Sequence, residues 1–208
     1  MSDEIHSPKM QDLILTHMLE HVPKLGWTLA SLKQGVIDAG YKEGDEHRAF
    51  QGNMDKVLEY YLLMIDRQMT ARLGEVDLLS MRVKDRVATA VMVRLRLLEK
   101  NKEAVRQSLR YLRHPTRTSL ALKGLYNTVN TIWYAAGDTS TDFNFYTKRT
   151  LLAGVYSATL FYWLDDTSED SIKTRAYLSR RLDQVMKIPK LKSQLSDGFS
   201  LLLKKVGL

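Results

Sequence analysis

The stretch Trp133–Leu164, WYAAGDTSTDFNFYTKRTLLAGVYSATLFYWL, contains a polar turn followed by one long helical segment. Gly137 and Asp138 end the segment before the turn, and residues 139–142 offer caps for the next helix. From Phe143 to Leu164 the sequence is apolar almost all round the helix, which is typical of a central or interface helix.

The other segments also follow a helical period, and only four prolines interrupt them. The sequence therefore predicts an all-α fold with nine to ten helices. Besides Phe143–Leu164, the predicted helices are Lys9–His21, Thr28–Gly40, Gly44–Phe50, one from about Asn53, one from about Leu78, Lys102–Leu112, one from Pro115, Glu169–Met186 and one from Pro189 to the end.

Three short helices followed by a long one form the layout of a helix-turn-helix regulator. The charge of this region opposes DNA binding, because the segment in the place of the recognition helix, residues 42–50, reads KEGDEHRAF. Its acidic side chains would repel phosphates. We expect a degenerate helix-turn-helix that binds no nucleic acid, and a ligand-responsive transcriptional regulator is the alternative.

The positive charge of the chain, +7 in total, lies mainly in the middle helices. A solvated surface and a surface for anionic lipid or an acidic partner both fit this distribution. The basic residues concerned are Arg82, Lys84, Arg86, Arg94, Arg96, Lys100, Lys102, Arg106, Arg110, Arg113 and Arg117.

Motifs for catalysis or metal binding are weak. The segment HMLEH, His17–His21, matches the H-x-x-E-H zinc pattern and would make Glu20 a base in a zinc hydrolase, but it supplies no third ligand. Two packed histidines are the simpler interpretation. Cysteine is absent, and no phosphate loop or nucleophile elbow occurs. We expect no metal, no catalytic residue and no enzymatic activity.

The last predicted helix, within residues 188–208, is amphipathic and carries lysines. This pattern is typical of a helix lying in a membrane interface, and a helix that docks on its own domain or on a dimer mate is the alternative. No apolar run is long enough to span a bilayer, so we expect peripheral contact. The membrane-facing residues would be Leu191, Leu195, Phe199, Leu202, Leu203, Lys204 and Lys205.

Residues 133–160, WYAAGDTSTDFNFYTKRTLLAGVYSATL, closely resemble the signature of the coenzyme Q (ubiquinone) biosynthesis protein nine (Coq-nine) family. Residues 14–35, ILTHMLEHVPKLGWTLASLKQG, are similar to the opening of that family. The two segments follow in the family's order, so the resemblance covers nearly the whole chain.

The resemblance implies a TetR-like homodimer that has lost DNA recognition and is not an enzyme. Such a protein needs no cofactor; it binds isoprenoid lipids, including ubiquinone precursors, in a hydrophobic cavity. It presents the demethoxy intermediate to the di-iron demethoxyubiquinone hydroxylase, of the Coq-seven type. The family's last helix binds phospholipid membrane, which implies a peripheral place on the cytoplasmic face of a bacterial inner membrane or on the matrix side of the mitochondrial one.

The resemblance also implies residue roles. It divides the chain into residues 1–50, the degenerate helix-turn-helix; 51–187, for lipid binding and dimerisation; and 188–208, for membrane binding. Phe145 stands where the family often has Trp. The expected hydroxylase-binding residues are Ile132, Asp142, Phe145, Tyr146 and Arg149. The expected lipid-binding residues are Leu125, Val129, Trp133, Leu152, Val155 and Tyr156.

Overall fold

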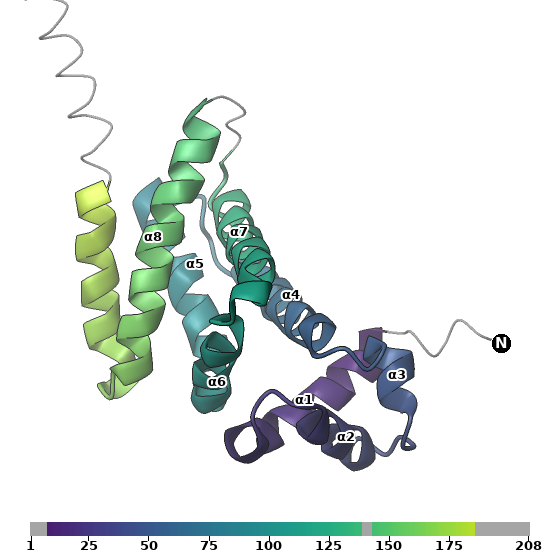
Figure 1. The fold of residues 1–208 in the computed structure, drawn as a ribbon. Coiled ribbons are helices and arrows are strands. Elements are labelled where there is room, and N and C mark those ends of the chain that lie inside the picture. The colour runs from purple at the N-terminus through teal and green to yellow at the C-terminus, as the bar shows by residue number, and fades with distance from the viewer. Residues whose placement is uncertain (1–7, 139–142, 186–208) are drawn as a thin grey trace, which may run out of the picture. The chain divides into compact units, whose positions relative to one another are not determined.

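The computed structural model describes residues 8–138 and 143–185, and their regular structure is helical throughout (Figure 1). This confirms the all-α prediction, and the helix count is close to the nine to ten expected of the whole chain. The α-helices are α1 (Pro8–Leu25), α2 (Leu29–Asp38), α3 (Asp45–Phe50), α4 (Met54–Leu73), α5 (Val83–Leu98), α6 (Lys102–Leu112), α7 (Thr118–Ala135), α8 (Phe143–Asp165) and the helical residues 172–185.

The chain divides into two compact units, Met1–Thr139 and Ser140–Leu208. The first unit holds α1 to α7, and the second holds α8 and residues 172–185. The functional boundaries expected at residues 50 and 187 stay predictions.

In the first unit, α1, α2 and α3 are grouped at the N-terminal end of α4 (Figure 1). α4 packs against both α5 and α7, and α1 packs against α6 as well as α2. The indole Nε1 of Trp27 donates a hydrogen bond to the carbonyl oxygen of Ala104 over 2.9 Å. A buried side chain between α1 and α2 is thereby joined to the first turn of α6.

The end of α1 differs from the prediction. The proline at position 23 was expected to stop the helix near His21, but α1 continues through it to Leu25. A proline in the last turn lacks a backbone N–H and so leaves out one helical hydrogen bond. The next bond of the helix still forms, because Gly26 N donates to Val22 O over 2.8 Å. The stop comes from Gly26, whose φ of +70° suits glycine.

The start of α2 agrees with the prediction. Thr28 is the N-cap, its hydroxyl accepts from Ser31 N, and the Ser31 hydroxyl accepts from Thr28 N. This reciprocal capping box satisfies two backbone donors that a helix start would leave open.

α5 begins at Val83 and not at about Leu78 as predicted. Residues 77–82 form a loop in which Ser80 Oγ donates to Asp77 O over 3.0 Å. The Arg86 guanidinium donates to the carbonyl oxygens of Met81 and Leu79 at 2.9 and 3.1 Å. These bonds satisfy loop carbonyls that a longer helix would have used itself.

In the second unit, α8 and residues 172–185 lie side by side (Figure 1). The ring of Tyr162 on α8 stacks on that of Tyr177, with centroids 4.4 Å apart. The extent of α8, Phe143–Asp165, agrees with the predicted Phe143–Leu164.

The turn between these two helices is fixed by one buried carboxylate, Asp166. Its Oδ1 accepts from the backbone N and the hydroxyl of Ser168 at 2.9 and 2.6 Å. Its Oδ2 accepts from the backbone N and the hydroxyl of Thr174 at 2.8 and 2.6 Å. Burial by itself raises the pKa of Asp166, but these hydrogen bonds outweigh it and hold the pKa well below its usual range.

Asp166→Asn should destabilise the protein by about 2 kcal/mol at neutral pH, because an amide offers one acceptor where the carboxylate offers two. The depressed folded pKa means that the carboxylate stabilises the fold above the unfolded pKa of about 3.9 and loses this effect as the pH falls below it. Urea unfolding followed by circular dichroism should therefore show a gap between wild type and variant that narrows below about pH 4.

The matched control is Asp170→Asn, which alters an exposed aspartate of the same turn. It should change stability by less than about 0.5 kcal/mol. Equal effects of the two variants would contradict the role given to Asp166.

Candidate functional site

The expected lipid-binding residues belong to two helices, one in each unit. On α7, Val129 is buried, while Leu125 and Trp133 are half-buried. On α8, Leu152, Val155 and Tyr156 are all buried. Within each helix the residues share one apolar face, as the helical spacing requires. Their role in binding a lipid stays a prediction.

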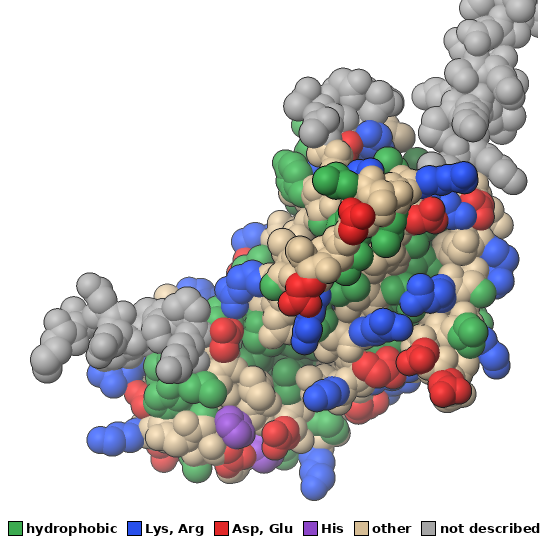
Figure 2. All heavy atoms as spheres, turned by 180° about the vertical axis from the view of Figure 1, so that it is seen from behind, with side chains coloured by type: hydrophobic (Ala, Val, Ile, Leu, Met, Phe, Trp, Pro, Cys, Tyr) green, Lys and Arg blue, Asp and Glu red, His purple; other side chains and the backbone are tan. Residues whose placement is uncertain are grey.

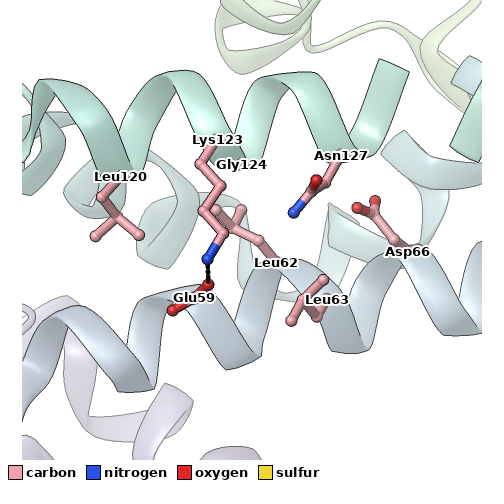
Figure 3. Close-up of a pocket in the computed structure, with 8 residues that line it drawn as sticks. All are labelled: Glu59, Leu62, Leu63, Asp66, Leu120, Lys123, Gly124 and Asn127. Atoms are coloured by element: carbon pink, nitrogen blue, oxygen red, sulfur yellow. Dashed lines mark ion pairs between the residues drawn. The ribbon is translucent and has the colours of Figure 1, made fainter. Parts of the chain in front are cut away.

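The first unit contains a recess between α4 and α7 that the sequence did not suggest (Figure 3). Across it, Lys123 Nζ lies 2.5 Å from Glu59 Oε1. The helices approach closely because Gly124 has no side chain: a Cβ there would lie 2.6 Å from Leu62 Cδ1. The lining residues are Glu59, Leu62, Leu63, Asp66, Leu120, Lys123, Gly124 and Asn127.

The enclosed volume of this recess is about 10 Å³. That is room for one water molecule at most and excludes an isoprenoid tail. Asp66 and Leu63 also line a more open groove beside it, together with Arg67, Thr70, Ala71 and Thr131. The recess and the groove therefore form one partly polar surface along α4 and α7.

Asp66 belongs to a buried network that joins three helices of the first unit. Arg94 of α5 donates from Nε to Asp66 Oδ1 over 2.9 Å and from Nη2 to Thr128 Oγ1 over 3.1 Å. Thr128 Oγ1 lies 3.1 and 3.0 Å from the two oxygens of Asp66. Arg94 is 2% exposed, so its place among the surface cations was wrong. Sequence periodicity could have placed it on the buried face, between Val91 and Leu95.

Arg94→Met should destabilise the protein by about 3–5 kcal/mol, because it leaves the Asp66 carboxylate buried without its counter-charge. Urea unfolding measures this loss. Arg96→Met is the matched control: Arg96 is exposed, has no ion-pair partner among the described residues, and should cost less than about 0.5 kcal/mol.

A second variant tests whether Arg94→Met loses stability because a charge is left unpaired or because packing is lost. Asp66→Leu combined with Arg94→Met removes both charges and should be more stable than Arg94→Met alone. If the double variant is the less stable of the two, the network acts through packing instead.

The structure brings together three of the residues expected to bind the hydroxylase. In the first turns of α8, the Arg149 guanidinium carbon lies 3.3 Å from the centroid of the Phe145 ring, and Nη1 donates to Phe145 O over 3.2 Å. The rings of Phe145 and Tyr146 meet edge to face at 5.1 Å. Arg149 is buried, whereas Tyr146 is 66% exposed. Tyr146 is thus the residue of the three most open to a partner.

The other expected contacts are placed differently. Ile132 lies on α7 in the first unit and is fully buried, so its side chain offers no surface to a partner in this conformation. Asp142 lies outside the described residues. So do the expected membrane-facing residues Leu191, Leu195, Phe199, Leu202, Leu203, Lys204 and Lys205.

The two histidines of the HMLEH segment are not part of a metal-binding cluster. The described part of the chain contains no group of three or more His, Asp or Glu side chains that could hold a metal ion. His21 Nε2 instead lies 2.5 Å from Asp38 Oδ2 on α2. Hydrogen bonds from Gln34 and then His21 lower the pKa of Asp38. This pairing ties α1 to α2.

Charged side chains of both signs lie on the surface of the described residues. On the face shown in Figure 2, Lys and Arg side chains are interspersed with Asp and Glu. None of the described helices has the length and apolar content needed to cross a membrane.

Comparison with solved structures defines the class of the fold. The chain aligns with a TetR transcriptional regulator from Nitrosomonas europaea ATCC 19718 at a TM-score of 0.69 and 20% identity, over 86% of this chain and 98% of that one. At this identity the match shows the fold alone, which is TetR-like as predicted.

The sequence comparisons then find similarity to one family. A COQ9 family model matches residues 118–189. The chain is 32% identical to the mitochondrial ubiquinone biosynthesis protein COQ9 of Homo sapiens, and the match covers 86% of this chain and 58% of the human protein. It is 29% identical to the protein of the same name from Rattus norvegicus, and that match covers 86% of this chain and 59% of the rat protein. These matches confirm the resemblance to the Coq-nine family. The chain spans about three fifths of the length of these relatives.

Proposed function

We propose that the chain is an accessory protein of ubiquinone biosynthesis that binds isoprenoid quinone precursors and presents them to the demethoxyubiquinone hydroxylase. The observation that carries the proposal is the similarity, over most of this chain, to proteins named ubiquinone biosynthesis protein COQ9. That similarity supports the role in ubiquinone biosynthesis. Lipid binding, presentation and the absence of catalysis by the chain itself are the finer parts of the proposal.

The physical reason for such a carrier is the cost of exposing an isoprenoid tail to water. Each CH₂ group that leaves water gains about 0.8 kcal/mol, so a tail moves readily only from the bilayer into another apolar environment. The recess between α4 and α7 is too small for a tail. The resemblance to the Coq-nine family instead suggests lipid-binding residues on the apolar face of α7 in the first unit and on that of α8 in the second. The residues concerned are Leu125, Val129, Trp133, Leu152, Val155 and Tyr156.

The protein purified from membrane-containing cells should carry a bound isoprenoid lipid. Native mass spectrometry would detect it as an added mass, and lipid extraction would identify its class. The same spectra test the proposed homodimer. A preparation that stays free of isoprenoid lipid after expression with membranes would contradict lipid carriage.

The hydroxylase would dock on the aromatic pair at the start of α8. Tyr146 offers a large exposed ring with a hydroxyl, and Arg149 holds the neighbouring Phe145 ring in place. Exposed aromatic residues beside a buried arginine are typical of the residues that dominate protein interfaces.

Tyr146→Ala should weaken binding of the hydroxylase by about tenfold or more, since the loss of an interface hot spot costs about 2 kcal/mol. Calorimetry or surface plasmon resonance with purified hydroxylase measures this. The matched control is Tyr126→Ala on α7, an exposed tyrosine outside the expected interface. Unchanged affinity of the Tyr146 variant, with its fold intact, would move the interface elsewhere.

The alternative, a ligand-responsive transcriptional regulator, has little support in the region that would read DNA. α3 has only six residues and begins with Asp45 and Glu46. Its one arginine, Arg48, is paired with Asp45 at 3.2 Å. A regulator would bind a specific DNA duplex, and replacement of Lys42 and Arg48 would abolish that binding. We expect no duplex binding by the wild type in a gel-shift assay at low salt.

We also propose that the protein works at a membrane surface, on the cytoplasmic side in a bacterium or the matrix side in a mitochondrion. The curated relatives are named as mitochondrial proteins, and isoprenoid quinone precursors reside in bilayers. Membrane fractionation with a high-salt wash tests this. Recovery in the soluble fraction under all conditions would contradict it.

A further inference from the structure

We infer that the outward face of α6 is a binding surface for anionic phospholipid headgroups. This surface, which we name the α6 stripe, consists of Lys102, Arg106, Arg110 and Arg113. It belongs to the first unit, so it is distinct from the expected membrane helix within residues 188–208. The inference deepens the proposed place at a membrane surface and rests on that part of the proposed function, but it does not depend on lipid carriage or on binding of the hydroxylase.

The segment that contains α6 carries the charge of the whole chain. Residues 82–117 hold eleven Lys and Arg against three Asp and Glu, a net +8, whereas the entire chain has +7. Three of these cations have structural roles, because Arg94 is buried against Asp66, Arg86 binds loop carbonyls and Arg117 is paired with Asp55 of α4. The remaining cations near α6 therefore concentrate the charge that faces solvent.

The cations of the α6 stripe lie on one side of the helix. At 100° per residue, positions 102, 106, 110 and 113 fall within about 80° of the circumference, along a line of about 17 Å. The opposite side carries Ala104, Val105 and Ser108, which are buried. The basic side of the helix thus lies away from its buried side, with Arg110 and Arg113 exposed and Lys102 and Arg106 half-buried.

The acids near this surface neutralise only part of it. Glu99 pairs with Lys102 at 3.6 Å, and Glu103 pairs with Arg106 at 3.3 Å. Four exposed cations have no ion-pair partner among the described residues. These are Arg96, Lys100, Arg110 and Arg113. Their unbalanced charge should attract a surface of opposite sign.

The residues beside the α6 stripe favour a bilayer over an acidic protein. Leu109 and Leu112 are half-exposed along its edge, and the stripe itself contains no aromatic side chain. Protein interfaces depend mainly on aromatic anchors, whereas basic residues with leucines beside them are typical of a helix that lies against anionic headgroups. Arginine also pairs well with phosphate through two parallel hydrogen bonds.

The test uses the full chain and two sets of vesicles, phosphatidylcholine alone and phosphatidylcholine mixed with phosphatidylglycerol. Arg110→Glu with Arg113→Glu should lower the affinity for the anionic vesicles by at least about tenfold, because each basic residue near such a surface contributes about fivefold. Binding to the neutral vesicles should stay unchanged. Co-sedimentation at low and high salt measures both.

The matched control is Lys42→Glu with Lys56→Glu, which makes the same change of net charge at exposed lysines away from α6. Equal losses of vesicle affinity in both double variants would mean that only net charge matters. Unchanged vesicle affinity of the Arg110 and Arg113 variant would mean that the bilayer does not touch the α6 stripe. Either result overturns the inference. The inference would also be overturned if the Arg110 and Arg113 variant bound an acidic protein less tightly than the wild type while its affinity for the vesicles stayed unchanged. Isoprenoid content, measured on the same preparations, reports separately on the proposed function.

Discussion

The burial of Arg94 is the constraint on which the first unit depends. A guanidinium inside a protein costs several kcal/mol unless it is paired and hydrogen-bonded, and here its charge is met by Asp66 of α4 and its second donor by Thr128 of α7. All three helices must keep one register for these bonds to form. That register also places Gly124 against Leu62 and Lys123 opposite Glu59, so the recess between α4 and α7 follows from it.

Two further polar contacts hold α6, one to the N-terminal helices and one to α4. Trp27 joins α6 through Ala104 O, and its ring lies 5.4 Å from that of Tyr61 on α4. At the other end of α6, Tyr111 donates to Asp55 of α4 over 2.6 Å. Burial and this carboxylate raise the pKa of Tyr111 to about 12, so the donor keeps its proton at any physiological pH. The acidic N-terminal region is thus part of the packed unit.

The sequence predicted the features that depend on local chemistry and missed those that depend on tertiary contacts. The start of α2 at Thr28 and the extent of α8 were predicted because caps and apolar faces are visible in the sequence itself. The continuation of α1 through Pro23, the loop held by Arg86 and the burial of Arg94 were not predicted. Each depends on a partner in another part of the fold, or on the conformation of a single glycine. Likewise, the sequence suggested the aromatic residues of α8 but gave no sign of the recess that Gly124 permits.

The arrangement at the start of α8 shows how Phe145 takes part in an aromatic surface. Phenylalanine has no N–H, so it cannot make the polar contact that an indole would offer. Its ring instead lies under the Arg149 guanidinium, which draws the cation into a buried position and holds the ring against Tyr146. In the proposed docking of the hydroxylase, polar contacts from this trio fall to the Tyr146 hydroxyl, since its ring is the exposed one. Phe145 and Arg149 act by fixing where that ring stands.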